Sequence, residues 1–284
     1  MYCLNHPDID DLIEIAIRED IGNGDHSSIA CIPKEQSGTA YCIAKEEGVI
    51  AGIELARKLF HKIDPNLIYT PFKKDGDLIE KGEHIFDVSG SDISILTAER
   101  LVLNFMQRLS GIASQSYKIK QLLNGYKTTI LDTRKTTPGM RLLEKWAVET
   151  GGCKNHRMGL YDMVMLKDNH VDFAGGIPAA IDKTKAYLTA NNLDLKIEIE
   201  TRNIEEVNQV LAKGGIHRIM LDNFSPEQIK EALKLIGDQY ETEASGGITL
   251  ATIKEYAETG VDFISVGALT HSSKSIDLSM RAYK

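Results

Sequence analysis

Apolar residues recur at regular spacings along the first hundred positions of the chain. A helix is predicted behind Asp8, a favourable N-cap, because apolar side chains repeat every three or four positions over 9–17, and the glycine-containing stretch 22–25 ends it. Strands are predicted at 39–44 and 48–51, a helix at 55–63, and short antiparallel strands between the glycine-containing turns of 73–91. The first part of the chain therefore predicts a small α+β unit.

From Asp92 the pattern changes to a long helical region, in which Gly111 is a candidate interruption. Beyond that region, short apolar runs alternate with helical stretches. The runs lie at 129–131, 163–166, 196–199, 218–221, 240–244 and 263–266. This rhythm is typical of repeated βα units that form a parallel sheet.

A barrel and an open sheet both fit such units, and the residues that follow each run favour the barrel. Charged or small residues stand there: Asp132 with Arg134 and Lys135, then Lys167, Glu200, Asp222, 245–247 and Gly267. In a β/α barrel every carboxyl end opens onto one face, so these groups would converge, whereas an open sheet would scatter several of them. The stretch is short of the roughly 250 residues that eight units need, so fewer than eight strands are expected.

The fold class predicted is α/β, with an N-terminal domain over 1–111 and a barrel domain that carries the site over 112–271. The tail 272–284 is a candidate to pack on the first domain.

Composition narrows the class of protein. The 284 residues are 42% hydrophobic and 26% charged, and the net charge of -8 argues against general binding to nucleic acid or anionic membranes. The start of the chain lacks the pattern of a signal peptide and no run is long enough to span a membrane, so a cytoplasmic protein is expected. Four widely spaced cysteines without a C-x-x-C pair support neither a disulfide framework nor a zinc site.

Cations gather in two stretches of this acidic chain, 132–139 ("DTRKTTPG") and 154–170 ("KNHRMGLYDMVMLKDNH"). The candidate anion-binding residues are Arg134, Lys135, His156, Arg157 and Lys167. Arginine forks suit carboxylates and phosphates, and lysine supplies a point charge. Glu200 and Asp222, facing such a cluster, suit Mg²⁺ held partly through water and substrate phosphates. The substrate is expected to be highly anionic.

Residues 244–249 ("ASGGIT") follow a predicted strand and open a predicted helix, so Ser245, Gly246 and Gly247 form a candidate phosphate cradle. Gly267 and His271 end the next strand in a similar way. Each feature alone also has a plainer interpretation: a turn for the glycines, strand-end salt bridges for the two acids, a structural histidine for His156. Together the residues predict a phosphate-handling barrel enzyme and no more.

Longer stretches carry a resemblance to a known family. They are 18–25 ("REDIGNGD"), 97–114 ("TAERLVLNFMQRLSGIAS"), 132–148 ("DTRKTTPGMRLLEKWAV"), 155–170, 197–200 ("IEIE"), 221–224 ("LDNF") and 243–249 ("EASGGIT"). In this order, and over nearly the whole chain, they resemble quinolinate phosphoribosyltransferase, the carboxylating nicotinate-nucleotide pyrophosphorylase, a pentosyltransferase of NAD biosynthesis.

The resemblance implies a homodimer in which an N-terminal α/β sandwich adjoins an incomplete, TIM-like α/β barrel. Quinolinate would react with 5-phosphoribosyl 1-diphosphate and Mg²⁺ to give nicotinate mononucleotide, diphosphate and CO2.

The resemblance also assigns roles to residues. Arg134, His156 and Arg157 would line the quinolinate pocket, with Lys135 and Lys167 shared between carboxylate and diphosphate, and Arg100 would reach in from the partner subunit. Glu200 and Asp222 would face the ribose and the metal. The 5-phosphate would be held by Ser245, Gly246, Gly247, Gly267 and His271.

Three other functions remain open. A paralogue associated with molybdenum transport resembles this family across the barrel, although a ligand with a single carboxylate would leave cations unpaired. A Schiff-base aldolase would use Lys167 as its nucleophile, because that chemistry needs a lysine at a strand end. A phosphate-ligand sensor without catalytic activity is the third.

Overall fold

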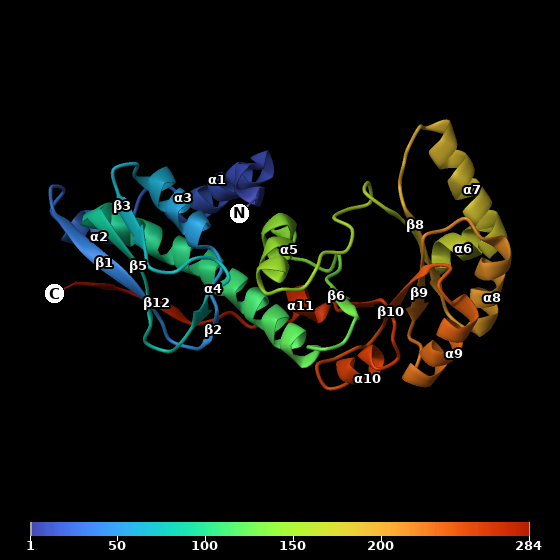
Figure 1. Cartoon of the computed structure of the whole chain (residues 1–284). Helices are drawn as coiled ribbons and strands as arrows, with labels where there is room; N and C mark the ends of the chain where they lie inside the picture. Colours follow the sequence, from blue (N-terminus) through green and yellow to red (C-terminus); the bar gives the residue numbers. More distant parts are fainter. Residues whose placement is uncertain (1, 284) are drawn as a thin grey trace. The chain divides into compact units, whose positions relative to one another are not determined.

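The computed structural model describes residues 2–283, and contacts divide the chain into two compact units (Figure 1). Unit 1 comprises Met1–Lys118, Thr136–Gly152 and Leu269–Lys284, and unit 2 comprises Ile119–Lys135 and Cys153–Ala268. This division differs from the single boundary predicted near Gly111, because helix α4 (Asp92–Leu122) continues through that glycine and the segment with helix α5 (Arg141–Thr150) returns to unit 1.

Unit 1 is an α+β unit, as predicted. Its other helices are η1 (Tyr2–Asn5), α1 (Pro7–Ile21), α2 (His26–Cys31) and α3 (Ile53–Ile63). The short helix α11 (Ala268–His271) begins at the last residue of unit 2 and continues into the final segment of unit 1. Its strands are β1 (Ser37–Ala44), β2 (Gly48–Val49), β3 (Ile68–Pro71), β4 (Leu78–Ile79), β5 (His84–Ser91) and β12 (Leu278–Ala282). The antiparallel order β12-β1-β5-β3 brings the C-terminal strand beside β1, and β2 pairs with β4.

The core of unit 1 is apolar. Register places Cys42 opposite Phe86 and Met280, so these side chains share one face of the sheet. Phe60 of α3 packs against that face, with its ring centroid 5.8 Å from Phe86 and 5.7 Å from Tyr69. Phe60, Phe86 and Cys42 are fully buried. The two layers are therefore held by ordinary hydrophobic burial.

Two local predictions for unit 1 were wrong. The first helix is capped by His6, whose Nδ1 accepts the amide of Asp8, because Pro7 occupies the first helical position where no N–H is needed. Gly111 does not interrupt α4; a Cβ there would collide with the backbone of Lys274 and Ser275, so the glycine serves close packing of the C-terminal segment.

Unit 2 contains the βα units. Its strands are β6 (Thr129–Leu131), β7 (Val164–Leu166), β8 (Ile197–Thr201), β9 (Arg218–Asp222), β10 (Glu241–Ser245) and β11 (Phe263–Ser265). Its helices are α6 (Asp168–Ala174), α7 (Ile177–Ala190), α8 (Ile204–Lys213), α9 (Pro226–Ile236) and α10 (Ile253–Ala257). The strands form one parallel sheet in the order β6-β11-β10-β9-β8-β7, which confirms the predicted parallel sheet. Every predicted apolar run became one of these strands.

Local sequence explains where the helices of unit 2 begin and end. Asn203 caps α8 by accepting the amide of Glu206, and Ser225 caps α9 just before Pro226. Gly214 and Gly237 follow the last turns at φ of 64° and 56°, which glycine adopts at little cost. Figure 1 shows α6 to α9 beside the strands they connect.

The two faces of the six-stranded sheet differ in polarity. Register pairs Glu198 with Arg218, Asp222 with Ser245 and Ile199 with Ile219. Because side chains alternate along a strand, one face carries Glu198, Glu200, Arg218, Asp222, Glu243 and Ser245, and is called here the polar face. The opposite face carries buried apolar side chains such as Ile199, Ile219, Leu221 and Ala244. Within the described residues, no helix has the length and apolar character to cross a membrane.

Candidate active site

The carboxyl ends of the parallel strands hold the predicted acids and one of the lysines. Lys167 follows β7 directly, and its Nζ lies 2.9 Å from Oε2 of Glu200 on the neighbouring strand β8. Glu200 is only 8% exposed, whereas the lysine head is exposed. Asp222 ends β9, next in the sheet. An ammonium and two carboxylates thus stand on three adjacent strands at one edge of the sheet.

The segment before His156 runs beside β6. Lys154 bridges Leu131 in parallel, and the amide of His156 donates to Oδ1 of Asp132 at 2.8 Å. Asp132 is fully buried at the end of β6. These contacts bring the two cation-rich stretches together, although Asp132 and His156 lie 24 positions apart in the chain.

The two arginines of these stretches interact. Burial lowers the pKa of Arg157, and the charge of Arg134 lowers it further. Arg157 Nη1 also donates to the carbonyl of Met163 at 3.1 Å, which orients the guanidinium. Lys135 is exposed beside Arg134 and its amide donates to Thr133 Oγ1 at 3.0 Å. Two guanidinium groups whose charges act on each other concentrate positive charge, which suits a dianion.

The loop after β10 has the backbone that the sequence predicts but not the helix. Gly246 and Gly247 have φ of 96° and 63°, and a Cβ at Gly246 would collide with Asn223. The amide of Asn223 donates to the carbonyl of Ser245 at 2.8 Å, which joins the ends of β9 and β10. The expectation that a helix opens at this loop was wrong: α10 starts only at Ile253 and is five residues long. Any phosphate here would meet loop amides.

Gly267 lies between β11 and α11 in unit 2, whereas His271 and Arg100 belong to unit 1. His271 ends the short helix α11, and its Nδ1 lies 2.7 Å from Ser272 Oγ. Arg100 is exposed on α4. Their predicted roles stay predictions.

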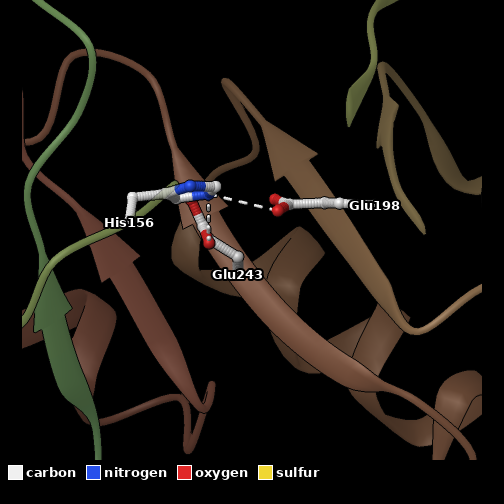
Figure 2. A group of neighbouring side chains, drawn as sticks. All are labelled: His156, Glu198 and Glu243. Carbon is white, nitrogen blue, oxygen red and sulfur yellow. Dashed lines mark ion pairs between the residues drawn. The ribbon is translucent and has the colours of Figure 1, made fainter. Parts of the chain in front are cut away.

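His156 has an environment that the sequence did not predict. Its side chain is 4% exposed, and Nε2 lies 3.1 Å from Glu198 Oε2 and 3.3 Å from Glu243 Oε2, both fully buried (Figure 2). Arg218 Nη1 lies 2.8 Å from the same oxygen of Glu243. On the polar face, four ionisable side chains therefore meet beneath the strand ends.

Burial and neighbouring charges together shift the pKa values of the residues in this cluster. Burial raises the pKa of Glu198, and Glu243 raises it further. Burial would also raise the pKa of Glu243, but contacts with His156 and Arg218 hold it below its usual range. Burial would lower the pKa of His156, but the two glutamates outweigh it and would raise the pKa to about 9. The backbone amide of Arg157 acts against this rise, because it donates to Nδ1 at 2.6 Å, an atom that a charged imidazole cannot offer as an acceptor.

Comparison with known proteins identifies the family. Residues 112–281 match the quinolinate phosphoribosyl transferase C-terminal domain, and residues 25–110 match the N-terminal domain of the same transferase. The chain belongs to the quinolinate phosphoribosyl transferase family. The resemblance of the quoted motifs is thereby confirmed.

Relatives in this family align over almost all of the chain. The chloroplastic nicotinate-nucleotide pyrophosphorylase [carboxylating] of Arabidopsis thaliana is 45% identical over 98% of this chain and 84% of its own length. The probable nicotinate-nucleotide pyrophosphorylase [carboxylating] of Bacillus subtilis is 43% identical over 98% of this chain and 94% of its own. The solved nicotinate-nucleotide pyrophosphorylase of Francisella tularensis has a TM-score of 0.90 at 40% identity, covering 96% of this chain and 95% of that one.

The site residues predicted from the sequence did not include Glu198, Glu243, Arg218 and Asn223. One signal was present: "KIEIET" alternates, so Glu198 must share a face with Glu200. Nothing local indicated that β10 and the segment before Arg157 would supply the other partners, because their contacts depend on sheet order.

Proposed function

We propose that this chain transfers the phosphoribosyl group of 5-phosphoribosyl 1-diphosphate to quinolinate with decarboxylation. The products are nicotinate mononucleotide, diphosphate and CO2. The observation that carries the proposal is that two neighbouring arginines, Arg134 and Arg157, occur together with acids at adjacent strand ends in a chain of the quinolinate phosphoribosyl transferase family.

The substrate's charges match these groups. Quinolinate presents two adjacent carboxylates, which suit Arg134 and Arg157, while Lys135 and Lys167 would share a carboxylate and the diphosphate. Ser245, Gly246, Gly247, Gly267 and His271 would bind the 5-phosphate through loop amides and polar side chains. His156 is included in the predicted pocket, but its 4% exposed ring favours an indirect role.

Mg²⁺ is the proposed cofactor, with Glu200 and Asp222 as the residues that would hold it. Glu200 is already paired with Lys167, and Asp222 Oδ2 accepts from the side-chain Nδ2 of Asn223. Two partly engaged carboxylates cannot enclose an ion, which fits an ion held largely by water and substrate phosphates. When bound, Mg²⁺ would neutralise charge on the departing diphosphate.

The residues of the chain would act mainly by position and charge. As the bond from ribose C1 to the diphosphate breaks, positive charge develops on the ribose, which Glu200 and Asp222 favour, while Lys135 and Lys167 favour the leaving diphosphate. The pyridine nitrogen supplies the electron pair for the new bond, so no general base is required. When the neighbouring carboxylate departs as CO2, the bonding electron pair stays on the ring carbon as a carbanion that the adjacent cationic nitrogen stabilises, and a proton from solvent adds to that carbon.

An incomplete α/β barrel and a homodimer belong to this proposal. Six parallel strands support the barrel, as does the segment at Lys154 that pairs with β6 and lengthens that edge. In the dimer, Arg100 would enter the neighbouring active site. An exposed arginine on α4 is compatible with such a contact.

The aldolase alternative is less favoured, because the Lys167 ammonium is engaged by Glu200 at 2.9 Å, whereas Schiff-base chemistry requires a neutral amine.

The test is to incubate the purified protein with Mg²⁺, 5-phosphoribosyl 1-diphosphate and either quinolinate or nicotinate, and to follow mononucleotide and CO2. Product and CO2 from quinolinate alone would support the proposal. Product from nicotinate alone would overturn the substrate assignment, and no product from either would overturn the activity.

A further inference from the structure

The buried cluster of His156, Glu198, Glu243 and Arg218 does not contribute to any step above. Burying ionisable groups costs free energy, and a parallel sheet ordinarily fills such positions with branched apolar residues. Here β8 and β10 each contribute a fully buried glutamate at this level. Their shared neighbour is one imidazole nitrogen, Nε2 of His156 (Figure 2).

The other ring nitrogen has a different partner. Nδ1 lies 2.6 Å from the backbone nitrogen of Arg157, whose N–H points toward it. An N–H donor requires an unprotonated nitrogen. The two carboxylates lie at ion-pair distance from Nε2 without hydrogen-bond geometry, and their negative charge favours a proton on that nitrogen. The neutral tautomer with its proton on Nε2 accepts the Arg157 amide at Nδ1 and places its proton beside the two carboxylates.

The same three residues offer ligand atoms within 4.8 Å of one another, as a metal site would. However, Arg218 Nη1 already lies 2.8 Å from Glu243 Oε2 and 3.9 Å from Glu198 Oε2. A divalent ion would share these oxygens with a guanidinium at short range, so the arrangement favours an N–H proton as the group between the carboxylates.

We propose that Glu198 and Glu243 are positioning residues that hold His156 as the Nε2–H tautomer, so that Nδ1 accepts the amide of Arg157 and sets the backbone from which Arg157 reaches its ligand. The two carboxylates act on the imidazole ring of His156, and that ring acts on the backbone amide of Arg157. Asp132 supports it from the other side by accepting the amide of His156 itself. The part of this inference that concerns quinolinate rests on the proposed function; the tautomer does not.

The tautomer can be measured on the free protein. Nitrogen-15 labelled histidine gives distinct two-bond correlation patterns for the two neutral tautomers and for imidazolium, and the His156 signals are assigned by their loss in His156→Asn. At neutral pH the expected pattern is a protonated Nε2 and an unprotonated Nδ1. The reverse tautomer or imidazolium would overturn the inference, whatever the enzyme does.

Two substitutions separate positioning from packing. Asparagine places its carbonyl oxygen near the position of Nδ1, whereas glutamine reaches toward that of Nε2. His156→Asn is therefore expected to keep a KM for quinolinate at least about tenfold lower than His156→Gln, because it retains an acceptor for the Arg157 amide. Equal values, or a better result for His156→Gln, would contradict the proposed route.

Glu198→Gln tests the other end, because a side-chain amide can donate to Nε2 and release the tautomer. We expect its His156 signals to shift toward the Nδ1–H form and its KM for quinolinate to rise by about tenfold, with the KM for 5-phosphoribosyl 1-diphosphate within about twofold. Glu241→Gln is the matched control. Glu241 lies on β10 and binds Arg218 at 3.0 Å, whereas the carboxylates beside His156 Nε2 are those of Glu198 and Glu243, so the KM values of this variant should not change.

Failures of the two proposals differ. A wild-type protein that lacks turnover with quinolinate refutes the proposed function and leaves the NMR result to decide the tautomer. A wild-type protein that turns over, with unchanged His156 signals and KM in Glu198→Gln, refutes the positioning role alone.

Discussion

The two main sheets of this protein obey the same alternation of side chains and use it in opposite ways. In unit 1 the covered face of the antiparallel sheet presents Cys42, Phe86 and Val88 to an apolar helix face. In unit 2 the parallel sheet turns its apolar face toward its helices and leaves glutamates and an aspartate on the other.

The difference separates stability from chemistry. Apolar burial is favourable wherever it occurs, whereas buried carboxylates cost free energy unless they are paired. Unit 2 accepts this cost across several strands, at the level of His156 and again at the level of Glu200. A sheet face that is both buried and charged is where a functional site is expected.

The largest expected effect tests the apolar sheet. Phe86→Ala removes a fully buried ring that packs on Phe60 and Tyr69, and should lower the free energy of unfolding by about 3–5 kcal/mol. Urea unfolding followed by circular dichroism measures this. Ile68→Ala on the same sheet is the control, because Ile68 is 67% exposed and should change stability by about 0.5 kcal/mol or less. A loss below about 1 kcal/mol for Phe86→Ala would contradict the assignment of this core.

Glu200→Gln should reduce activity and leave stability almost unchanged, the reverse of Phe86→Ala. Losing a negative charge beside the developing ribose cation is expected to reduce kcat/KM by about 100- to 1000-fold, with little change in thermal unfolding. Steady-state kinetics with both substrates measures this. The exposed Glu205→Gln, on α8, should behave like the unsubstituted protein. A reduction of less than about fivefold would remove Glu200 from the catalytic group.

A smaller effect distinguishes the two substrates. Arg134→Ala and Arg157→Ala should each weaken quinolinate binding by about 10- to 100-fold, as expected for a lost charge-assisted hydrogen bond, and affect 5-phosphoribosyl 1-diphosphate less. Calorimetric titration of each ligand gives the two constants. Equal losses for both ligands would show that these arginines do not select the dicarboxylate.

The smallest signal tests the site shared between subunits. If Arg100 acts across a dimer interface, mixing inactive Arg100→Ala and Glu200→Ala chains should restore roughly a quarter of full activity, because half of the dimers are mixed and each has one complete site. Subunit exchange is verified by mass spectrometry before the assay. Exchange without recovered activity would place Arg100 in its own chain's site.

Much of the fold could be predicted because the signals are local. Each strand of unit 2 starts within a residue or two of its apolar run, since short β-branched segments between polar turns favour extended backbone. β3 was missed because its residues include the exposed Ile68 and end in Pro71, as suits an edge strand. Asp8 was wrongly predicted as the cap of the first helix, because Pro7 at the first helical position makes His6 the cap. The interruption predicted at Gly111 was wrong, because that glycine allows close packing of Lys274.

The sequence by itself determined the order of elements, the residue types at the strand ends and, through long specific motifs, the family. These properties depend on near neighbours in the chain or on exact strings of residues. Only the tertiary structure decided which charges meet: Lys167 with Glu200, and His156 with Glu198 and Glu243. Those pairs depend on sheet order and register, where a shift of one residue would turn each carboxylate to the opposite face, and hydrophobic spacing along one strand does not specify its partners.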